Sequence, residues 1–157
     1  MSEPAWCHDV VIPALLRHAR NTYGVAMRRA LVEAGFEDVP RNGLYVIGGL
    51  ALGAGGVPLR QLVRELRISK QAAGQLIDTL VERGYLDRAV DPADRRRLNI
   101  ALTQRGSAAA AAQAIARERI DTQLANRVGA EGVTALRRGL AALIEIGQAD
   151  DPADTAH

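Results

Sequence analysis

The sequence predicts a mainly α-helical fold with one small β-hairpin. Alanine and leucine dominate the chain of 157 residues, and both residues favour helices over sheets. Apolar residues recur at helical spacing in most segments, whereas a short stretch near residue 100 alternates apolar and polar side chains. The length suits one hydrophobic core, so we expect a single domain over residues 1–157.

Two helices are predicted in the first third of the chain. Residues 12–34 carry apolar side chains at helical spacing. Pro13 is tolerated in a first turn and Gly35 suits a helix end. A second helix is predicted to start near Pro40, to run through Leu50 and to end in the glycine-rich residues 53–56.

The middle of the chain predicts two short helices and a hairpin. Pro58 opens a helix that reaches Leu66, and Ser69 is the expected N-cap of a helix that reaches Arg83. Residues 85–90 and 97–102 are predicted to pair as strands, because the second of these segments alternates apolar and polar residues.

Two further helices are predicted after the hairpin. Thr103 caps a long helix over about 103–127, and a last helix runs over about 130–146. Each carries an apolar stripe. The tail from Gly147 onward is acidic and poor in large apolar groups, which is typical of disorder.

The order of the middle elements is that of a helix-turn-helix followed by a wing. The apolar stripe of the helix over 69–83 leaves an opposite, polar face made of Lys70, Gln71, Gly74, Gln75 and Asp78. A helix of this kind fits the major groove of DNA, where glutamine reads adenine and lysine reads guanine. Glycine in mid-helix costs about 1 kcal/mol against alanine, which close approach to DNA explains. The alternative is an ordinary solvated face.

Three arginines stand on the turn of the predicted hairpin. Asp91 and Pro92 reverse the chain, and Arg95, Arg96 and Arg97 follow. Guanidinium groups on a loop lie along phosphates or enter the minor groove, and Asp94 is expected to brace the turn by pairing with a neighbouring arginine. The net charge of +2 is small, but residues 57–106 hold ten basic against six acidic residues. The alternative is a charged turn that serves solubility.

Residues 69–106 resemble the recognition helix and wing of the MarR (multiple antibiotic resistance regulator) family. The wing "DPADRR" followed by "LTQRG" is the most specific part. The resemblance implies a winged helix-turn-helix lobe over 37–106, dimerisation helices over 1–36 and 107–147, and a disordered tail over 148–157.

The resemblance also assigns roles to single residues. Asp94 and Arg96 match the wing's aspartate–x–arginine pair, with Arg96 at the minor groove. The resemblance further implies a homodimeric repressor that a small phenolic or lipophilic molecule releases from DNA. Arg95 and Arg97 then serve phosphates, Arg88 belongs to the same DNA-binding wing, and the base-facing residues of the helix are Ser69, Lys70, Gln71 and Gln75.

A dimer is also expected from the apolar stripes of the last two helices. A helix of about 25 residues is some 37 Å long, and the small winged lobe is too short to cover that surface. A second copy of the chain covers it. A two-fold dimer then needs a pseudo-palindromic double-stranded DNA site, with half-sites about one helical turn apart.

Other classes of protein find less support. Cys7 alone forms no internal disulfide and suits the cytoplasm; a peroxide-sensing regulator that uses Cys7 is one alternative, and a winged-helix module that binds protein instead of DNA is another. The spacing of Cys7, His8 and His18 is unlike a zinc motif. With three serines and no catalytic constellation we expect neither an enzyme nor a cofactor. The N-terminus lacks the layout of a signal peptide, and no apolar run suits a membrane span.

Overall fold

The computed structural model describes Pro4, residues 6–53, Val57–Pro58, Arg64, residues 66–96 and residues 98–149. The chain divides into two compact units. The larger unit comprises Ala5–Arg117, and the smaller unit comprises Glu118–His157 with Met1–Pro4.

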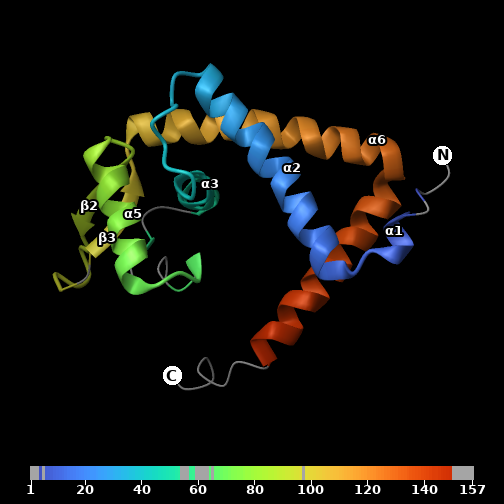
Figure 1. The fold of residues 1–157 in the computed structure, drawn as a ribbon. Coiled ribbons are helices and arrows are strands. Elements are labelled where there is room, and N and C mark those ends of the chain that lie inside the picture. Colours follow the sequence, from blue (N-terminus) through green and yellow to red (C-terminus); the bar gives the residue numbers. More distant parts are fainter. Residues whose placement is uncertain are drawn as a thin grey trace. The chain divides into compact units, whose positions relative to one another are not determined.

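The larger unit holds the helices and the sheet shown in Figure 1. Its elements are α1 (Trp6–Asp9), α2 (Ile12–Glu33), α3 (Gly43–Leu52), β1 (Val57–Pro58), α5 (Lys70–Glu82), β2 (Leu86–Val90), β3 (Leu98–Leu102) and the beginning of α6 (Gln104–Ala149). The helices expected over 12–34 and 69–83 and both strands of the hairpin are confirmed. The helix expected from Pro40 begins three residues later. The short helix α1 was not predicted.

The sheet has three antiparallel strands in the order β1-β3-β2. The hairpin aligns Leu86 with Leu102 and Val90 with Leu98, while Pro58 of β1 lies opposite Asn99. The prediction that Pro58 opens a helix is therefore wrong. Proline lacks an N–H for the ladder and is tolerated on an edge strand, which is the position of β1. Most of the helix predicted up to Leu66 lies outside the described residues.

The core of the larger unit forms where α3, α5 and the sheet meet. The apolar stripe predicted for α5 is buried in it through Ala73, Ile77 and Leu80. The other large hydrophobic side chains that are fully buried are Leu31, Val46, Ile47, Tyr85, Leu86 and Ile100. α5 packs beside β2 (Figure 1), so the position of α5 is fixed relative to the hairpin.

The junction between β3 and α6 is a single residue, Thr103. Its hydroxyl donates a hydrogen bond to the carbonyl of Gly84 and accepts one from the backbone N–H of Gly106, at 3.0 Å. The expected cap is thus confirmed. Gly106 is buried directly against the backbone of Tyr85, and a Cβ built on it would lie 2.1 Å from the Tyr85 carbonyl oxygen.

The smaller unit consists, in its described part, of the second half of α6. Gly129 interrupts the helix with φ 72° and ψ 172°, so α6 is two helices joined at a left-handed glycine, as the two predicted ranges imply. The helix continues to Ala149, and the prediction of a disordered tail from Gly147 is wrong for its first three residues. Residues 150–157 lie outside the described part. Within that part of the chain, no helix is long and apolar enough to cross a membrane.

Candidate nucleic-acid interface

Helix α5 presents the polar face that the sequence predicts. Ser69 adopts an extended conformation, and its Oγ accepts a hydrogen bond from the backbone N–H of Ala72 at 3.1 Å. This cap fixes where the helix starts. Because one face of α5 is buried in the core, Lys70, Gln71, Gln75 and Asp78 point outward and are exposed.

Gly74 lies on the same face and has open space around it. A Cβ on Gly74 would meet no atom within 4 Å. Packing inside the chain therefore does not require a glycine here, although glycine in mid-helix costs about 1 kcal/mol. The described contacts of the chain leave the choice of glycine unexplained.

An ion pair joins α5 to the wing. Nη2 of Arg88 on β2 donates to Oδ1 of Asp78, and the two side chains are 37% and 63% exposed. An exposed pair of this kind adds less than about 1 kcal/mol of stability, but it fixes the direction of the Arg88 side chain. The sequence assigned both residues to the DNA-facing set without indicating that they pair.

Two aspartates shape the turn of the wing. Oδ1 of Asp91 accepts the backbone N–H of Ala93 at 2.8 Å, and Oδ1 of Asp94 accepts that of Arg96 at 3.0 Å. Both are Asx turns, in which a side chain replaces a backbone acceptor. Asp94 thus braces the turn through the backbone of Arg96, and its expected pairing with an arginine side chain stays a prediction.

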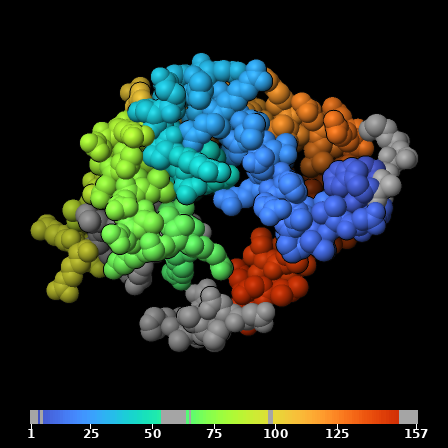
Figure 2. Space-filling model, in the orientation of Figure 1, coloured from blue at the N-terminus to red at the C-terminus, as the bar shows by residue number. Residues whose placement is uncertain are grey.

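The guanidinium groups of the wing face outward. Arg95 and Arg96 are exposed, and the turn, drawn in olive, projects from the surface beside α5 in Figure 2. Arg97 lies outside the described residues. The structure therefore places five predicted side chains on one side of the larger unit's core, on α5 and on the neighbouring turn: Lys70, Gln71, Gln75, Arg95 and Arg96.

A polar cluster that the sequence did not predict holds the base of the wing. Asp38 accepts hydrogen bonds from the hydroxyl of Tyr85 and from Arg105 Nη2, the latter at 3.1 Å. Arg105 also lies 4.6 Å from the centre of the Tyr85 ring and 5.4 Å from that of Phe36. The hydrogen bond from Tyr85 and the charge of Arg105 lower the pKa of Asp38. Burial, with the bond to Asp38, raises the pKa of Tyr85 to about 12.

Tyr85→Phe is expected to lower the free energy of unfolding by about 1 kcal/mol at neutral pH, because it removes the bond to Asp38. The tyrosine contributes a second, pH-dependent effect. Its pKa is about 10 in the unfolded chain and about 12 in the folded one. The contribution of Tyr85 to the free energy of unfolding is therefore fully present below pH 10. It falls as the pH rises toward 12, since in that range the tyrosine ionises in the unfolded chain but not in the folded one. Urea unfolding at about pH 7 and pH 11 checks whether this fall is smaller in the variant, and an equal fall would contradict the assignment.

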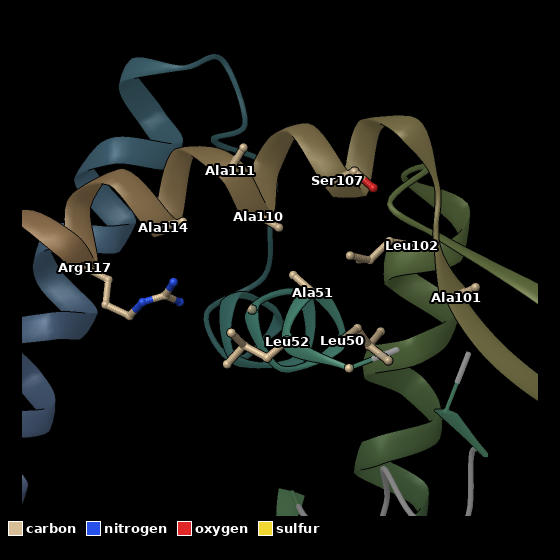
Figure 3. Close-up of a pocket in the computed structure, with 12 residues that line it drawn as sticks. Leu50, Ala51, Leu52, Ala101, Leu102, Ser107, Ala110, Ala111, Ala114 and Arg117 are labelled. Carbon is tan, nitrogen blue, oxygen red and sulfur yellow. The ribbon is translucent and has the colours of Figure 1, made fainter. Parts of the chain in front are cut away.

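A mainly apolar cavity of about 530 Å³ lies in the larger unit between α3, β3 and the first turns of α6 (Figure 3). Small and apolar side chains line it, among them Leu50, Leu52, Ala101, Leu102 and Ala110, and among the described lining residues only Arg117 is charged. This volume is in the range of small-molecule sites.

Gln113 of α6 is a buried polar residue near the same wall. It is 1% exposed, and neither polar atom of its amide has a hydrogen-bond partner among the described residues. A Cβ on Gly48, which lines the cavity, would lie 3.1 Å from Gln113 Oε1. No motif in the sequence marks this glutamine.

The MarR family model matches residues 37–97, which span α3, α5, β2 and the wing turn. The matched segment contains the helix-turn-helix and the wing just described. Over these residues the chain is similar to the MarR family.

Several solved structures share the fold. The structure of MarR from E. coli in its apo form is 18% identical, with a TM-score of 0.61, and the match covers 85% of this chain and 96% of that one. FabT of Streptococcus pneumoniae, solved in complex with DNA, is 19% identical, with a TM-score of 0.73 and coverages of 89% and 97%. A probable transcriptional regulator from Pseudomonas aeruginosa is 25% identical, with a TM-score of 0.61 and coverages of 86% and 98%. No curated protein sequence matches the chain.

The remaining predicted site of the chain is Cys7. It is a free thiol on the short helix α1 and is partly exposed. The described residues contain no group of three histidine, cysteine or carboxylate side chains that is arranged to hold a metal ion. Neither observation assigns a function to Cys7.

Proposed function

We propose that this MarR-type regulator binds a pseudo-palindromic double-stranded DNA site as a homodimer and represses transcription until a small lipophilic molecule releases it. The observation that carries the proposal is the exposed polar face of α5 beside a wing turn whose arginines point outward. In this proposal α5 enters the major groove and Arg96 the minor groove.

The chemistry of the α5 face supports direct reading of bases. Gln71 and Gln75 carry amides that match the donor and acceptor edge of adenine, and Lys70 matches guanine. The space around Gly74 leaves room for a close approach of DNA. Arg95 and Arg97 are assigned to phosphates, and Arg88, held by Asp78, lies at the junction of the helix and the wing.

The structural likeness to FabT also supports the proposal. FabT, whose match covers 89% of this chain, was solved in complex with DNA. At 19% identity the likeness concerns the fold, and in this proposal the helix and the wing of that fold contact the same duplex.

Uncovered apolar surface supports the homodimer. None of the described residues 118–149 is buried, although α6 carries large apolar side chains there. Leu136, Leu143 and Ile144 are 46%, 42% and 62% exposed, and Ile12 of α2 is 59% exposed. Helices with such stripes bury them against a partner in a stable protein. A second copy supplies that partner and gives two recognition helices for two half-sites.

The cavity between α3 and α6 supports release by a small molecule. Its lining is mainly alanine and leucine, which suits a lipophilic ligand, and Arg117 and Ser107 are polar groups at its wall. Because the cavity touches both the end of β3 and the first turns of α6, a ligand bound there contacts the two elements that support the wing.

Arg96→Ala and Gln71→Ala are expected to have different effects on DNA binding. After the bound site has been selected from a random pool of duplexes, Arg96→Ala should weaken binding to most duplexes and lower the slope of log K against log salt by about one unit. Gln71→Ala should relax the sequence preference at one position by about 1–3 kcal/mol. Fluorescence anisotropy over a series of salt concentrations measures both effects.

Arg137→Ala on the smaller unit is the matched control, because it removes one exposed arginine outside α5 and the wing. It should leave the affinity and the salt slope unchanged. If the two variants of α5 and the wing bind every duplex as tightly as the parent protein, these elements do not read DNA. A winged-helix module for protein partners is then the better description.

A further inference from the structure

Helix α2 is buried in the larger unit only at its last turns. Leu31 is the one buried residue among residues 12–33, while Ile12 and Leu16 near the start of the helix are exposed. A cavity of about 610 Å³ lies between α2 and the start of α3. Across it, the guanidinium of Arg20 lies 4.3 Å from the centre of the Tyr45 ring. Close packing along the length of α2 therefore does not fix its tilt.

A small tilt at the buried end moves the exposed end of α2 by several ångströms. The helix has 22 residues and is therefore about 33 Å long, so a tilt of about 5° displaces its far end by about 3 Å. In the proposed homodimer the exposed start of α2 belongs to the surface that a second copy covers, whereas α5 and the wing contact DNA. The tilt of α2 against the rest of the larger unit then decides how far apart the two copies of α5 lie.

The loop between α2 and α3 is held from two sides by arginines. Arg28 of α2 donates from Nη1 to the carbonyl of Val39 at 2.6 Å, and from Nη2 to the next two carbonyls of the chain at 3.0 and 3.3 Å. Arg83, the C-cap residue of α5, donates to the carbonyl of Asp38. Four successive carbonyl groups thus bind guanidinium groups of two different helices, which ties the end of α2 to the end of α5.

The side chain of Asp38 extends this connection to the wing and to α6. Its Oδ1 accepts hydrogen bonds from the Tyr85 hydroxyl and from Arg105 Nη2. Tyr85 directly precedes β2, and Arg105 lies in the first turn of α6. The ring of Phe36 packs edge-on against that of Tyr85, with 6.1 Å between the ring centres. Arg28 and Asp38 therefore stand at the two ends of a short connection between α2 and the base of the wing.

We propose that Arg28 and Asp38 are positioning residues that set the distance between the two DNA half-sites to which the homodimer binds. The inference rests on the proposed function, because it requires two copies of the chain on one duplex. The pair of Asp38 with Arg105 is partly exposed and adds little to stability. Its effect is on the direction of α2.

The size of this effect matches the step of the DNA helix. One additional base pair moves the half-sites apart by about 3.4 Å and rotates one against the other by about 35°. The shift is as large as the displacement that a tilt of about 5° gives at the end of α2. An intact connection therefore restricts the dimer to one spacing, and a broken connection permits the neighbouring spacings as well.

Duplexes that differ in the number of base pairs between the half-sites test the proposal. Fluorescence anisotropy on the full-length protein compares the selected operator with versions that are one base pair longer or shorter, and with a duplex that carries one half-site. The parent protein should bind the altered spacings at least about tenfold more weakly than the operator, because the second copy of α5 no longer engages. In Asp38→Ala and in Arg28→Met this loss should shrink to less than about threefold, while the half-site affinity stays within about twofold of the parent.

Glu33→Gln is the matched control. It also removes a carboxylate that pairs with an arginine, Arg29 at 2.8 Å, but both of these residues lie on α2. It should discriminate between the spacings as the parent does. Circular dichroism at the assay temperature shows that each variant is folded, and two variants at opposite ends of the connection keep the test decisive where one of them does not fold.

Three outcomes would overturn the inference while the proposed function stands. The first is a parent protein that binds the operator and the altered spacings equally well. The second is a discrimination by both variants as strong as that of the parent. The third is a fall of more than about tenfold in half-site affinity in both variants, which means that the connection shapes the DNA-binding surface itself. A parent protein that binds no duplex contradicts the proposed function, and the inference fails with it.

Discussion

Replacing Gly106 with alanine is expected to lower the free energy of unfolding by more than about 3 kcal/mol. The added Cβ would lie 2.1 Å from the carbonyl oxygen and 3.1 Å from the carbonyl carbon of Tyr85, and 3.0 Å from a methyl group of Leu102. Because the nearest atoms belong to the backbone, a change of rotamer does not relieve the clash. Moving the start of α6 away from Tyr85 to relieve the clash also strains the hydrogen bonds that Thr103 makes to Gly84 and Gly106.

Urea unfolding followed by circular dichroism measures this effect, with Gly49→Ala as the control. Gly49 is exposed on α3, and a Cβ there meets nothing within 4 Å. Alanine is the better helix former by about 1 kcal/mol, so the control should be neutral or stabilising. If Gly106→Ala is as stable as the parent, the close approach of α6 to Tyr85 is wrong.

The double variant Leu136→Glu/Leu143→Glu is expected to convert the proposed homodimer into monomers and to weaken operator binding at least about a hundredfold. The two leucines lie seven residues apart on one face of α6 and are 46% and 42% exposed. Two carboxylates on each copy would be buried without partners in the interface, and their desolvation opposes association. A monomer holds one half-site and loses the high effective concentration that the second lobe supplies.

Sedimentation velocity and fluorescence anisotropy measure the two effects. Ala135→Glu/Ala142→Glu is the matched control, because it adds the same charge at the same spacing on the opposite, exposed face of the helix. It should remain a dimer that binds the operator. A parent protein that sediments as a monomer would contradict the dimer itself, and a variant that dimerises normally would place the interface elsewhere.

Features that depend on neighbours in the chain were predictable from the sequence. The buried stripe of α5 follows from apolar residues at helical spacing, and it fixes the outward face that holds Lys70 and Gln75. Ser69 and Thr103 were predicted as caps because each precedes an apolar helical pattern, and both make capping bonds. The break at Gly129 falls between the two predicted helices.

Features that depend on contacts between distant residues were not predictable. β1 is only two residues long, so it has no alternation to recognise, and proline at its edge resembles a helix start. Asp38 meets Tyr85 across 47 residues of sequence. In the sequence the arginines of α2 are scattered along a polar helix face, and only the fold brings Arg41 close to them. In each case the signal lies in tertiary packing, which a local pattern does not contain.

The one-residue link at Thr103 has a mechanical consequence for regulation. Because a single residue links the strand to the helix, a tilt of the first turn of α6 is transmitted directly to β3. Both elements line the same cavity, β3 through Ala101 and Leu102 and α6 through Ser107 and Ala110. In the proposed function, an occupant that separates β3 from α6 would therefore tilt the hairpin as a whole, together with the arginines that are proposed to contact DNA.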